Sequence, residues 1–82
     1  MKPGLYQHVS LTSDIPQYNL KKGDIATLVE YVPGPEGIEK GCILEVFNAN
    51  GESINVITVP ESSIASLSPD QILTVRPLTK VG

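Results

Sequence analysis

The sequence holds one histidine and one cysteine, the side chains that most often serve as metal ligands or nucleophiles. Catalysis or metal binding by His8 would need partner residues at a set spacing, and no such pattern surrounds it. Cys42 lies in the apolar run Cys42-Ile43-Leu44, without a neighbouring base to form a thiolate. We therefore expect His8 on the surface of a strand and Cys42 as a small buried apolar residue.

Carboxylates are the other candidates for chemistry. Glu36, Glu39, Glu45 and Glu52 could in principle pair for acid–base work or bind Ca²⁺. A calcium loop needs closely spaced oxygen ligands in a D-x-D-x-D-G pattern, which the sequence lacks. We expect solvated carboxylates, although Glu45 shares its strand face with apolar neighbours.

Phosphate and peptide binding can be judged in the same way. The glycines at 34, 37 and 41 are not followed by Gly-Lys-Ser/Thr or by a helix that could hold a phosphate. A groove for proline-rich peptides needs aromatic walls, and the chain has no Trp. The sequence therefore predicts no catalytic residue, no metal site and no cofactor, and a protein that is not an enzyme.

The sequence predicts strands separated by turns, and these strands would position any functional site. Branched apolar residues predict strands at 5–12, 25–32, 41–47, 53–59 and 72–76. The second of these has apolar residues at both parities, which predicts a bend. One helical turn is expected from Pro60, and no segment keeps a helical period. The pattern predicts a single all-β domain over residues 1–82, a small five-stranded SH3-like barrel.

Specific positions follow from that architecture. Gly23 is expected to adopt a turn conformation open mainly to glycine, and Asn48–Gly51 is expected to be a hairpin turn. The expected core takes apolar residues from every predicted strand: Val9, Leu11, Ile25, Leu28, Val29, Leu44, Val46, Ile57, Val59, Leu73 and Val75.

The net charge and the lengths of the apolar runs limit the classes of partner and the cellular location that we expect. The net charge is −3, and residues 23–82 carry eight carboxylates against three cations. Nucleic-acid binding needs clustered Lys and Arg, so this balance makes nucleic acid an improbable ligand. No apolar run is long enough for a signal peptide or a membrane span, and the lone cysteine suits a reducing compartment. A cytoplasmic location is expected.

One stretch resembles a known family. The run Asn19–Glu30 (NLKKGDIATLVE), together with Asp14 and Pro16 before it and Asn48, Gly51, Glu52, Thr58 and Val59 after it, is similar to a family of small bacterial domains of unknown function. The chain departs from the family pattern at residues 45–47, which read E-V-F instead of V-E-F. This resemblance implies an SH3-like barrel and no particular activity. Lys-x-Gly-Asp also resembles the KOW pattern of ribosomal and transcription-factor barrels, over about a dozen residues, where shared turn mechanics can explain it.

Two long connections flank the second predicted strand, Ser13–Leu20 and Pro33–Lys40. Loops on a rigid scaffold commonly carry binding, and Tyr offers apolar area together with a hydroxyl. We therefore predict a protein-binding surface centred on Tyr18, Tyr31, Glu36 and Glu39, with the alternative that both rings simply cover the end of the barrel. The expected function is a non-catalytic protein-interaction module, in its sharper form the neutralising or regulatory partner of another protein. The alternative is a KOW-like nucleic-acid-binding barrel.

Overall fold

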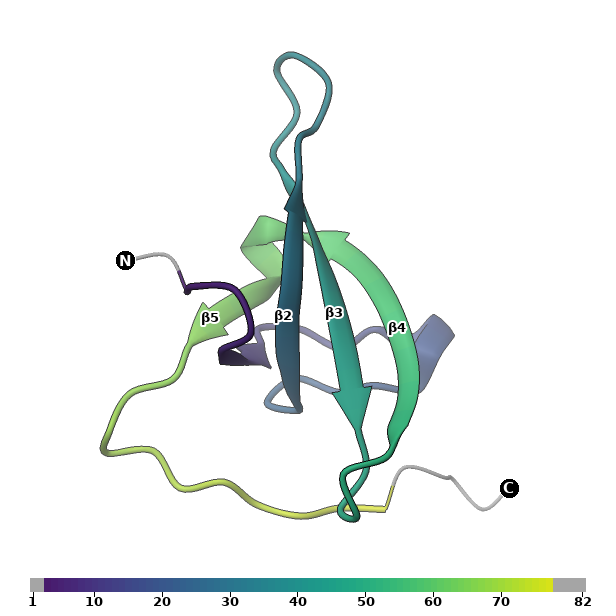
Figure 1. Ribbon diagram of the computed structural model, residues 1–82, viewed down its shortest axis with the longest axis vertical. Helices are drawn as coiled ribbons and strands as arrows, with labels where there is room; N and C mark the ends of the chain where they lie inside the picture. The colour runs from purple at the N-terminus through teal and green to yellow at the C-terminus, as the bar shows by residue number, and fades with distance from the viewer. Residues whose placement is uncertain (1–2, 78–82) are drawn as a thin grey trace.

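The computed structural model describes residues 3–77 as one antiparallel sheet with the strand order β4-β3-β2-β1-β5 (Figure 1). The strands are β1 (His8–Leu11), β2 (Ile25–Val32), β3 (Gly41–Phe47), β4 (Ser53–Pro60) and β5 (Ile64–Ser66). The two helical segments, η1 (Pro16–Tyr18) and η2 (Glu61–Ser63), are single 3-10 turns. Neither is long enough to cross a membrane. The all-β class is confirmed, but β4 and β5 are free edges in the described chain, so the sheet is not closed.

The predicted bend of β2 is confirmed. Its pairing with β3 shifts register between Leu28 and Glu30, which marks a β-bulge. A second shift lies between β3 and β4, where Val46 pairs with Asn55 but Phe47 pairs with Ser53. Bulges bend a strand and redirect its side chains. These two irregularities let one sheet wrap around a single core.

The core lies on the inner face of the curved sheet. Leu28, Leu44 and Val9 are completely buried, as is Cys42, which confirms its predicted role. Other predicted core residues are buried as well, whereas Ile25 and Val29 are only half-buried. The complete cluster is Val9, Leu11, Ile15, Leu20, Ala26, Leu28, Cys42, Leu44, Val46, Ile57, Val59 and Ile64.

The predicted fifth strand is wrong. Residues 72–76 form no strand, and Leu73 and Val75, expected in the core, are exposed. The fifth strand is instead Ile64–Ser66, which pairs with β1 directly after η2. Thr12 fixes this return of the chain, since its N–H donates to the Ser63 carbonyl and its Oγ1 to the Ser62 carbonyl, both at 2.9 Å. The edge of β1 is therefore occupied before the chain reaches residue 72.

Turn chemistry sets two other junctions. Gly23 has φ of +93°, which confirms the predicted glycine conformation, and its N–H donates to the Leu11 carbonyl at 2.8 Å. The hairpin between β3 and β4 is also confirmed. Asn48 Oδ1 accepts the N–H groups of Asn50 and Glu52, each at 2.9 Å, and Gly51 has φ of +82°.

Candidate functional site

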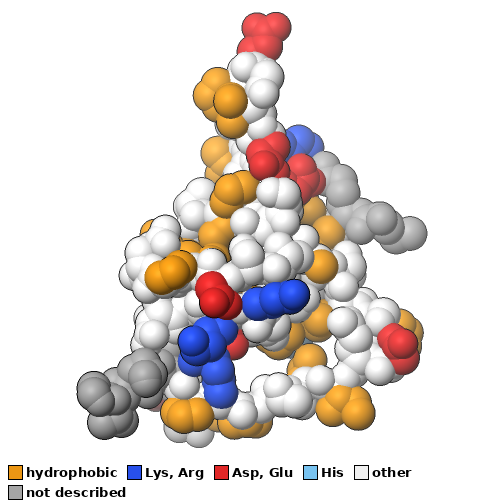
Figure 2. All heavy atoms as spheres, turned by 180° about the vertical axis from the view of Figure 1, so that it is seen from behind, with side chains coloured by type: hydrophobic (Ala, Val, Ile, Leu, Met, Phe, Trp, Pro, Cys, Tyr) orange, Lys and Arg blue, Asp and Glu red, His pale blue; other side chains and the backbone are white. Residues whose placement is uncertain are grey.

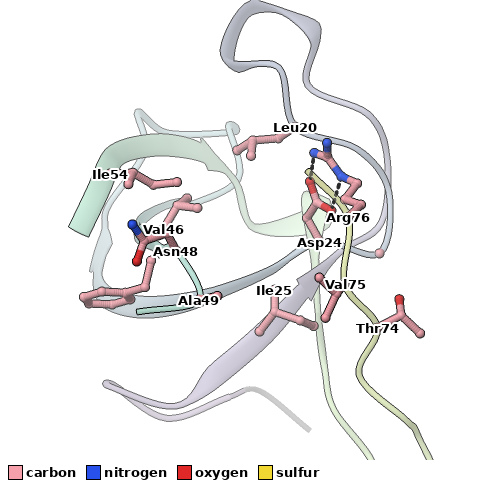
Figure 3. A pocket seen from close by; sticks show the side chains of 12 residues that line it. Leu20, Asp24, Ile25, Val46, Asn48, Ala49, Ile54, Thr74, Val75 and Arg76 are labelled. Atoms are coloured by element: carbon pink, nitrogen blue, oxygen red, sulfur yellow. Dashed lines mark hydrogen bonds and ion pairs between the residues drawn. The ribbon is translucent and has the colours of Figure 1, made fainter. Parts of the chain in front are cut away.

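A hollow of about 290 Å³ lies at the end of the sheet where β3 ends and β2 begins (Figure 3). Its walls come from the segment after η1, from the β3–β4 hairpin and from residues near the C-terminus. They are Leu20, Gly23, Asp24, Ile25, Val46, Phe47, Asn48, Ala49, Ile54, Thr74, Val75 and Arg76. A smaller hollow beside it shares Ile25 and Phe47 and is also lined by His8, which is exposed as predicted.

The apolar walls of the hollow are only partly covered. The bulge in β4 makes Ile54 the additional residue between two paired positions, and its side chain lines the hollow. Ile54 is 40% exposed and Phe47 is 41% exposed. Because large apolar side chains that meet solvent together often mark a contact surface, this end of the sheet is a candidate binding surface.

A C-terminal arm, residues 67–77, passes across this end of the sheet without joining it (Figure 1). Ile72, Leu73 and Val75 are 87, 57 and 93% exposed. The backbone of residues 72–75 makes no hydrogen bond with any described residue. The arm thus carries a strand-forming apolar sequence that stays in solvent.

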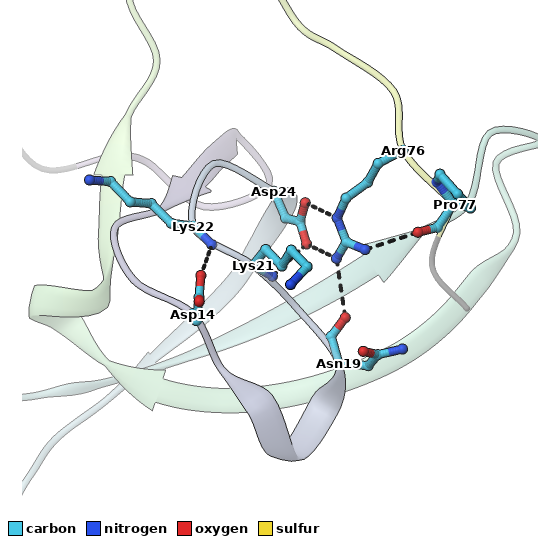
Figure 4. A network of polar contacts seen from close by, with 7 residues as sticks. All are labelled: Asp14, Asn19, Lys21, Lys22, Asp24, Arg76 and Pro77. Atoms are coloured by element: carbon cyan, nitrogen blue, oxygen red, sulfur yellow. Dashed lines mark hydrogen bonds and ion pairs between the residues drawn. The ribbon is translucent and has the colours of Figure 1, made fainter. Parts of the chain in front are cut away.

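One side chain fastens the arm. Arg76 Nε donates to Asp24 Oδ1 at 2.9 Å, and Arg76 Nη2 donates to Asp24 Oδ2 (Figure 4). Nη2 also donates to the Asn19 carbonyl at 3.1 Å, and Nη1 to the carbonyl of Pro77 at 2.9 Å. The ion pair is partly shielded, with side-chain exposures of 29% for Arg76 and 21% for Asp24. A two-point contact of this kind suits guanidinium and carboxylate geometry.

The turn before β2 holds Asp24 ready for this contact. The N–H of Lys21 donates to Asp24 Oδ2 at 2.8 Å, while the backbone carbonyl of Asp24 accepts from Leu11 N–H at 2.9 Å. Burial raises the pKa of Asp24, but the hydrogen bonds from Arg76 and Lys21 and their positive charges together lower the pKa below its ordinary value. Asp24 is therefore a fixed, ionised acceptor at neutral pH.

The four residues of the predicted protein-binding surface do not come from one place. Tyr31 packs against the core, and its hydroxyl donates to the Pro3 carbonyl at 2.8 Å. Glu39 accepts hydrogen bonds from Ser62, from N–H at 2.9 Å and from Oγ at 3.1 Å. Glu36 is exposed in the 33–40 loop, which projects beyond the sheet, whereas Tyr18 lies in η1 behind β4 and also packs on the core (Figure 1).

Lys40 completes the surroundings of Tyr31, with its Nζ 5.5 Å from the ring centre. Tyr31 thus lies beside Lys40 at the base of the 33–40 loop. Glu39, in the same loop, is hydrogen-bonded to Ser62 of η2. Tyr18 is on a different part of the molecule. Whether these residues bind a partner stays a prediction.

Lys and Arg side chains gather on the back of the molecule with acidic side chains among them (Figure 2). Lys21, Lys22 and Arg76 lie near Asp14 and Asp24 (Figure 4). The N–H of Lys22 donates to Asp14 Oδ1 at 2.8 Å. Within residues 3–77, His, Cys, Asp and Glu do not form a group of three that could hold a metal ion.

Residues 5–66 match the family described as "Domain of unknown function (DUF4926)". The chain belongs to this family. The expectation of a domain of unknown function is confirmed, and the DUF4926 match includes all five strands. Comparison with curated proteins and with solved structures finds no match. The Asp24 acceptor lies inside the DUF4926 region, while Arg76 and the whole arm lie beyond its end at residue 66.

Proposed function

We propose that this DUF4926 chain is a non-catalytic protein-interaction module that binds its partner with the hollow end of the sheet. The observation that carries this proposal is the apolar arm, whose Ile72, Leu73 and Val75 stay exposed. Of these, Val75 lines the hollow together with the exposed Phe47 and Ile54. Apolar surface of this kind is costly in water and marks contact sites on soluble proteins. A partner that covers both the arm and the hollow would bury it.

We further propose that the open sheet represents an SH3-like barrel. The order of elements supports this: a first strand, a long loop with η1, the meander β2-β3-β4, the single turn η2, and a last strand beside the first. In barrels of this kind the loops at the ends of the strands are the usual binding elements.

The charge distribution suggests the partner's chemistry. The chain carries a net charge of −3, and residues 23–82 hold more carboxylates than Lys and Arg side chains. A basic protein would be attracted by this field and would associate rapidly. The neutralising or regulatory partner of a basic protein is therefore the specific form of the proposal, in a cytoplasmic setting.

The test is affinity capture with purified bait proteins in extract from the native cells. One bait carries Ile72→Ser, Leu73→Ser and Val75→Ser together. These side chains are exposed, so each change should alter the free energy of unfolding by less than about 0.5 kcal/mol. We expect the wild-type chain to retain a specific protein that the triple variant loses.

The matched control is Ile38→Ser, which changes another exposed apolar residue in the 33–40 loop. It should retain the partner as the wild type does. Retention of the same proteins by the triple variant would contradict the proposed surface. Loss of the partner in Tyr18→Ala or Tyr31→Ala without loss of stability would instead place binding on the tyrosine surface with Glu36 and Glu39.

The nucleic-acid alternative rests on Lys21 and Lys22, and two carboxylates lie close to them. Asp14 holds the backbone of Lys22, and Asp24 is paired with Arg76. Two or three cations with such neighbours would neutralise few phosphates. We expect only weak, non-specific binding to RNA or DNA at physiological salt. Sub-micromolar affinity in a filter-binding assay would favour the KOW-like function over the protein-interaction function.

A further inference from the structure

The rim of the hollow contains an acceptor built for one guanidinium group. Asp24 presents both carboxylate oxygens to Arg76, and the Asn19 carbonyl takes a further bond from Nη2. Both acceptors are held by backbone structure. The Lys21 N–H binds the Asp24 carboxylate, and Asn19 has the left-handed φ of +60° as the cap of η1. Lys cannot reproduce this planar, two-point contact.

The acceptor residues lie inside the DUF4926 region, and the arginine bound to them lies outside it. Asn19 and Asp24 lie within the DUF4926 region, whereas Arg76 lies ten residues past its end, at residue 66. The arm gains little else from docking, because its apolar side chains remain exposed and residues 72–75 form no backbone hydrogen bond with the described chain. The hydrogen bonds of Arg76 are therefore the main attachment of the arm to the sheet.

We propose that the Asp24–Asn19 acceptor is a docking site for an arginine on an extended segment of a partner protein, and that the arm occupies it in competition. This rests on the proposed function and names the kind of partner that would fit. The partner is a basic protein with an exposed, extended segment in which an apolar residue precedes the arginine, as Val75 precedes Arg76. The arginine binds Asp24, and the apolar residue approaches the walls formed by Val46 and Ile54.

Exchange of this kind is nearly balanced at the acceptor, because one arginine–aspartate pair replaces another. The tethered arm has an advantage, since a short tether gives an effective concentration in the millimolar range. A partner overcomes it by filling the hollow and by covering the released arm. Ile72, Leu73 and Val75 would then pack on the partner instead of facing solvent.

The experiment uses the 82-residue chain with Arg76→Ala, which empties the acceptor without removing any residue. The probe is a fluorescent, end-blocked peptide with the sequence of residues 71–77 (QILTVRP), followed by fluorescence anisotropy. We expect the Arg76→Ala chain to bind it at least about tenfold more tightly than the wild type does, because the wild-type arm competes. Peptides with Lys or Ala in place of the arginine should bind at least about tenfold more weakly than the parent peptide.

A second variant adds Asp24→Asn to Arg76→Ala. Asn keeps an oxygen for the Lys21 N–H, so the turn is retained, and a denaturation midpoint for each protein checks the fold. We expect this protein to lose peptide binding. Glu39→Gln on the Arg76→Ala background is the matched control, since Glu39 binds Ser62 and not the arm, and it should bind the peptide normally.

The proposal is overturned if the Arg76→Ala chain does not bind the peptide, if it binds the arginine and alanine peptides equally, or if Asp24→Asn leaves binding unchanged. Equal binding by wild type and Arg76→Ala would overturn the competition. These failures are distinguishable from failure of the proposed function. If the serine variants of the arm still lose the captured partner while the peptide fails to bind, the surface is right and the arginine acceptor is wrong.

Discussion

The loop of residues 33–40 and the arm of residues 67–77 both leave the sheet and expose apolar side chains, but they are held in opposite ways. An added Cβ at Gly34 would lie 2.5 Å from the Glu39 carbonyl oxygen, so the two sides of the loop touch backbone to backbone. Glu39 is bonded to Ser62, and the Lys40 carbonyl accepts the Glu61 N–H at 2.9 Å. The arm is fastened by the single side chain of Arg76.

The 33–40 loop is therefore held as a fixed part of the fold, whereas the arm can exchange with a partner under the proposal above. Ile38 in the loop is exposed to a degree comparable with Leu73 in the arm, at 62 and 57%. Exposure alone therefore does not identify the binding element. The number and kind of contacts behind each segment decide whether it can leave the sheet, because opening a segment costs the contacts it loses.

The largest effect should come from Tyr31, which anchors the loop end. Tyr31→Ala removes a half-buried ring from the core and the hydrogen bond to Pro3, so we expect the free energy of unfolding to fall by about 2 kcal/mol. Tyr31→Phe, which loses only the hydroxyl, should cost about 1 kcal/mol. Urea denaturation measures both. An unchanged midpoint in Tyr31→Ala would mean that the ring is free to serve a partner.

A smaller loss is expected at Gly34. Gly34→Ala places a Cβ against the carbonyl oxygens of Glu39 and Ile38, at 2.5 and 2.8 Å before relaxation, so the loop must open. We expect a loss of about 1.5 kcal/mol by urea denaturation. Ile38→Ala is the control in the same loop and should stay within about 0.5 kcal/mol of the wild type. If Gly34→Ala matched that control, the loop would be no better braced than the arm.

The smallest effect we predict is detachment of the arm at low pH. Burial raises the pKa of Asp24, but the bonds from Arg76 and Lys21 outweigh it, so the pKa in the folded protein lies below the ordinary value of 3.8. A lowered pKa means that the ionised carboxylate stabilises the docked arm above the unfolded pKa and that this is lost as the pH falls through the folded pKa. The arm should therefore detach only as the pH falls through this lowered pKa, below 3.8, while the sheet persists. NMR signals of Asn19 and Arg76 that stay constant down to complete acid unfolding would contradict this.

The sequence predicted the central meander well. Branched apolar residues and the turns at Gly23 and Asn48–Gly51 placed β2, β3 and β4 within one residue of their observed bounds. Local propensity failed at the fifth strand, because Ile72–Arg76 is as strand-forming as Ile64–Ser66. Only the turn of η2, which delivers Ile64 beside β1, decides between them. Intrinsic preference was overruled by the position of a free edge.

The candidate site was less accessible from sequence. Asp24 and Arg76 are separated by 52 positions, and no local pattern pairs them. The sequence marks Lys-Lys-Gly-Asp as a turn, but no pattern in it indicates that the aspartate accepts hydrogen bonds from a distant arginine. Residues 72–76 were expected to form a strand with Leu73 and Val75 in the core, which hid the possibility of an exposed arm. An apolar strand pattern shows that burial is favoured, but not whether the burial occurs within the chain or against a partner.

Arg76 fastens the arm, and we expect the arm to detach from the sheet where the 33–40 loop does not. The most direct test compares backbone amide NMR spectra of the wild-type 82-residue chain and its Arg76→Ala variant. We predict shifts at Asn19, Asp24 and the arm, with amide signals of residues 67–77 becoming sharp and fast-exchanging, while the 33–40 loop is unchanged. Spectra in which Asn19 and Asp24 do not shift, or in which the loop changes as much as the arm, would contradict the account.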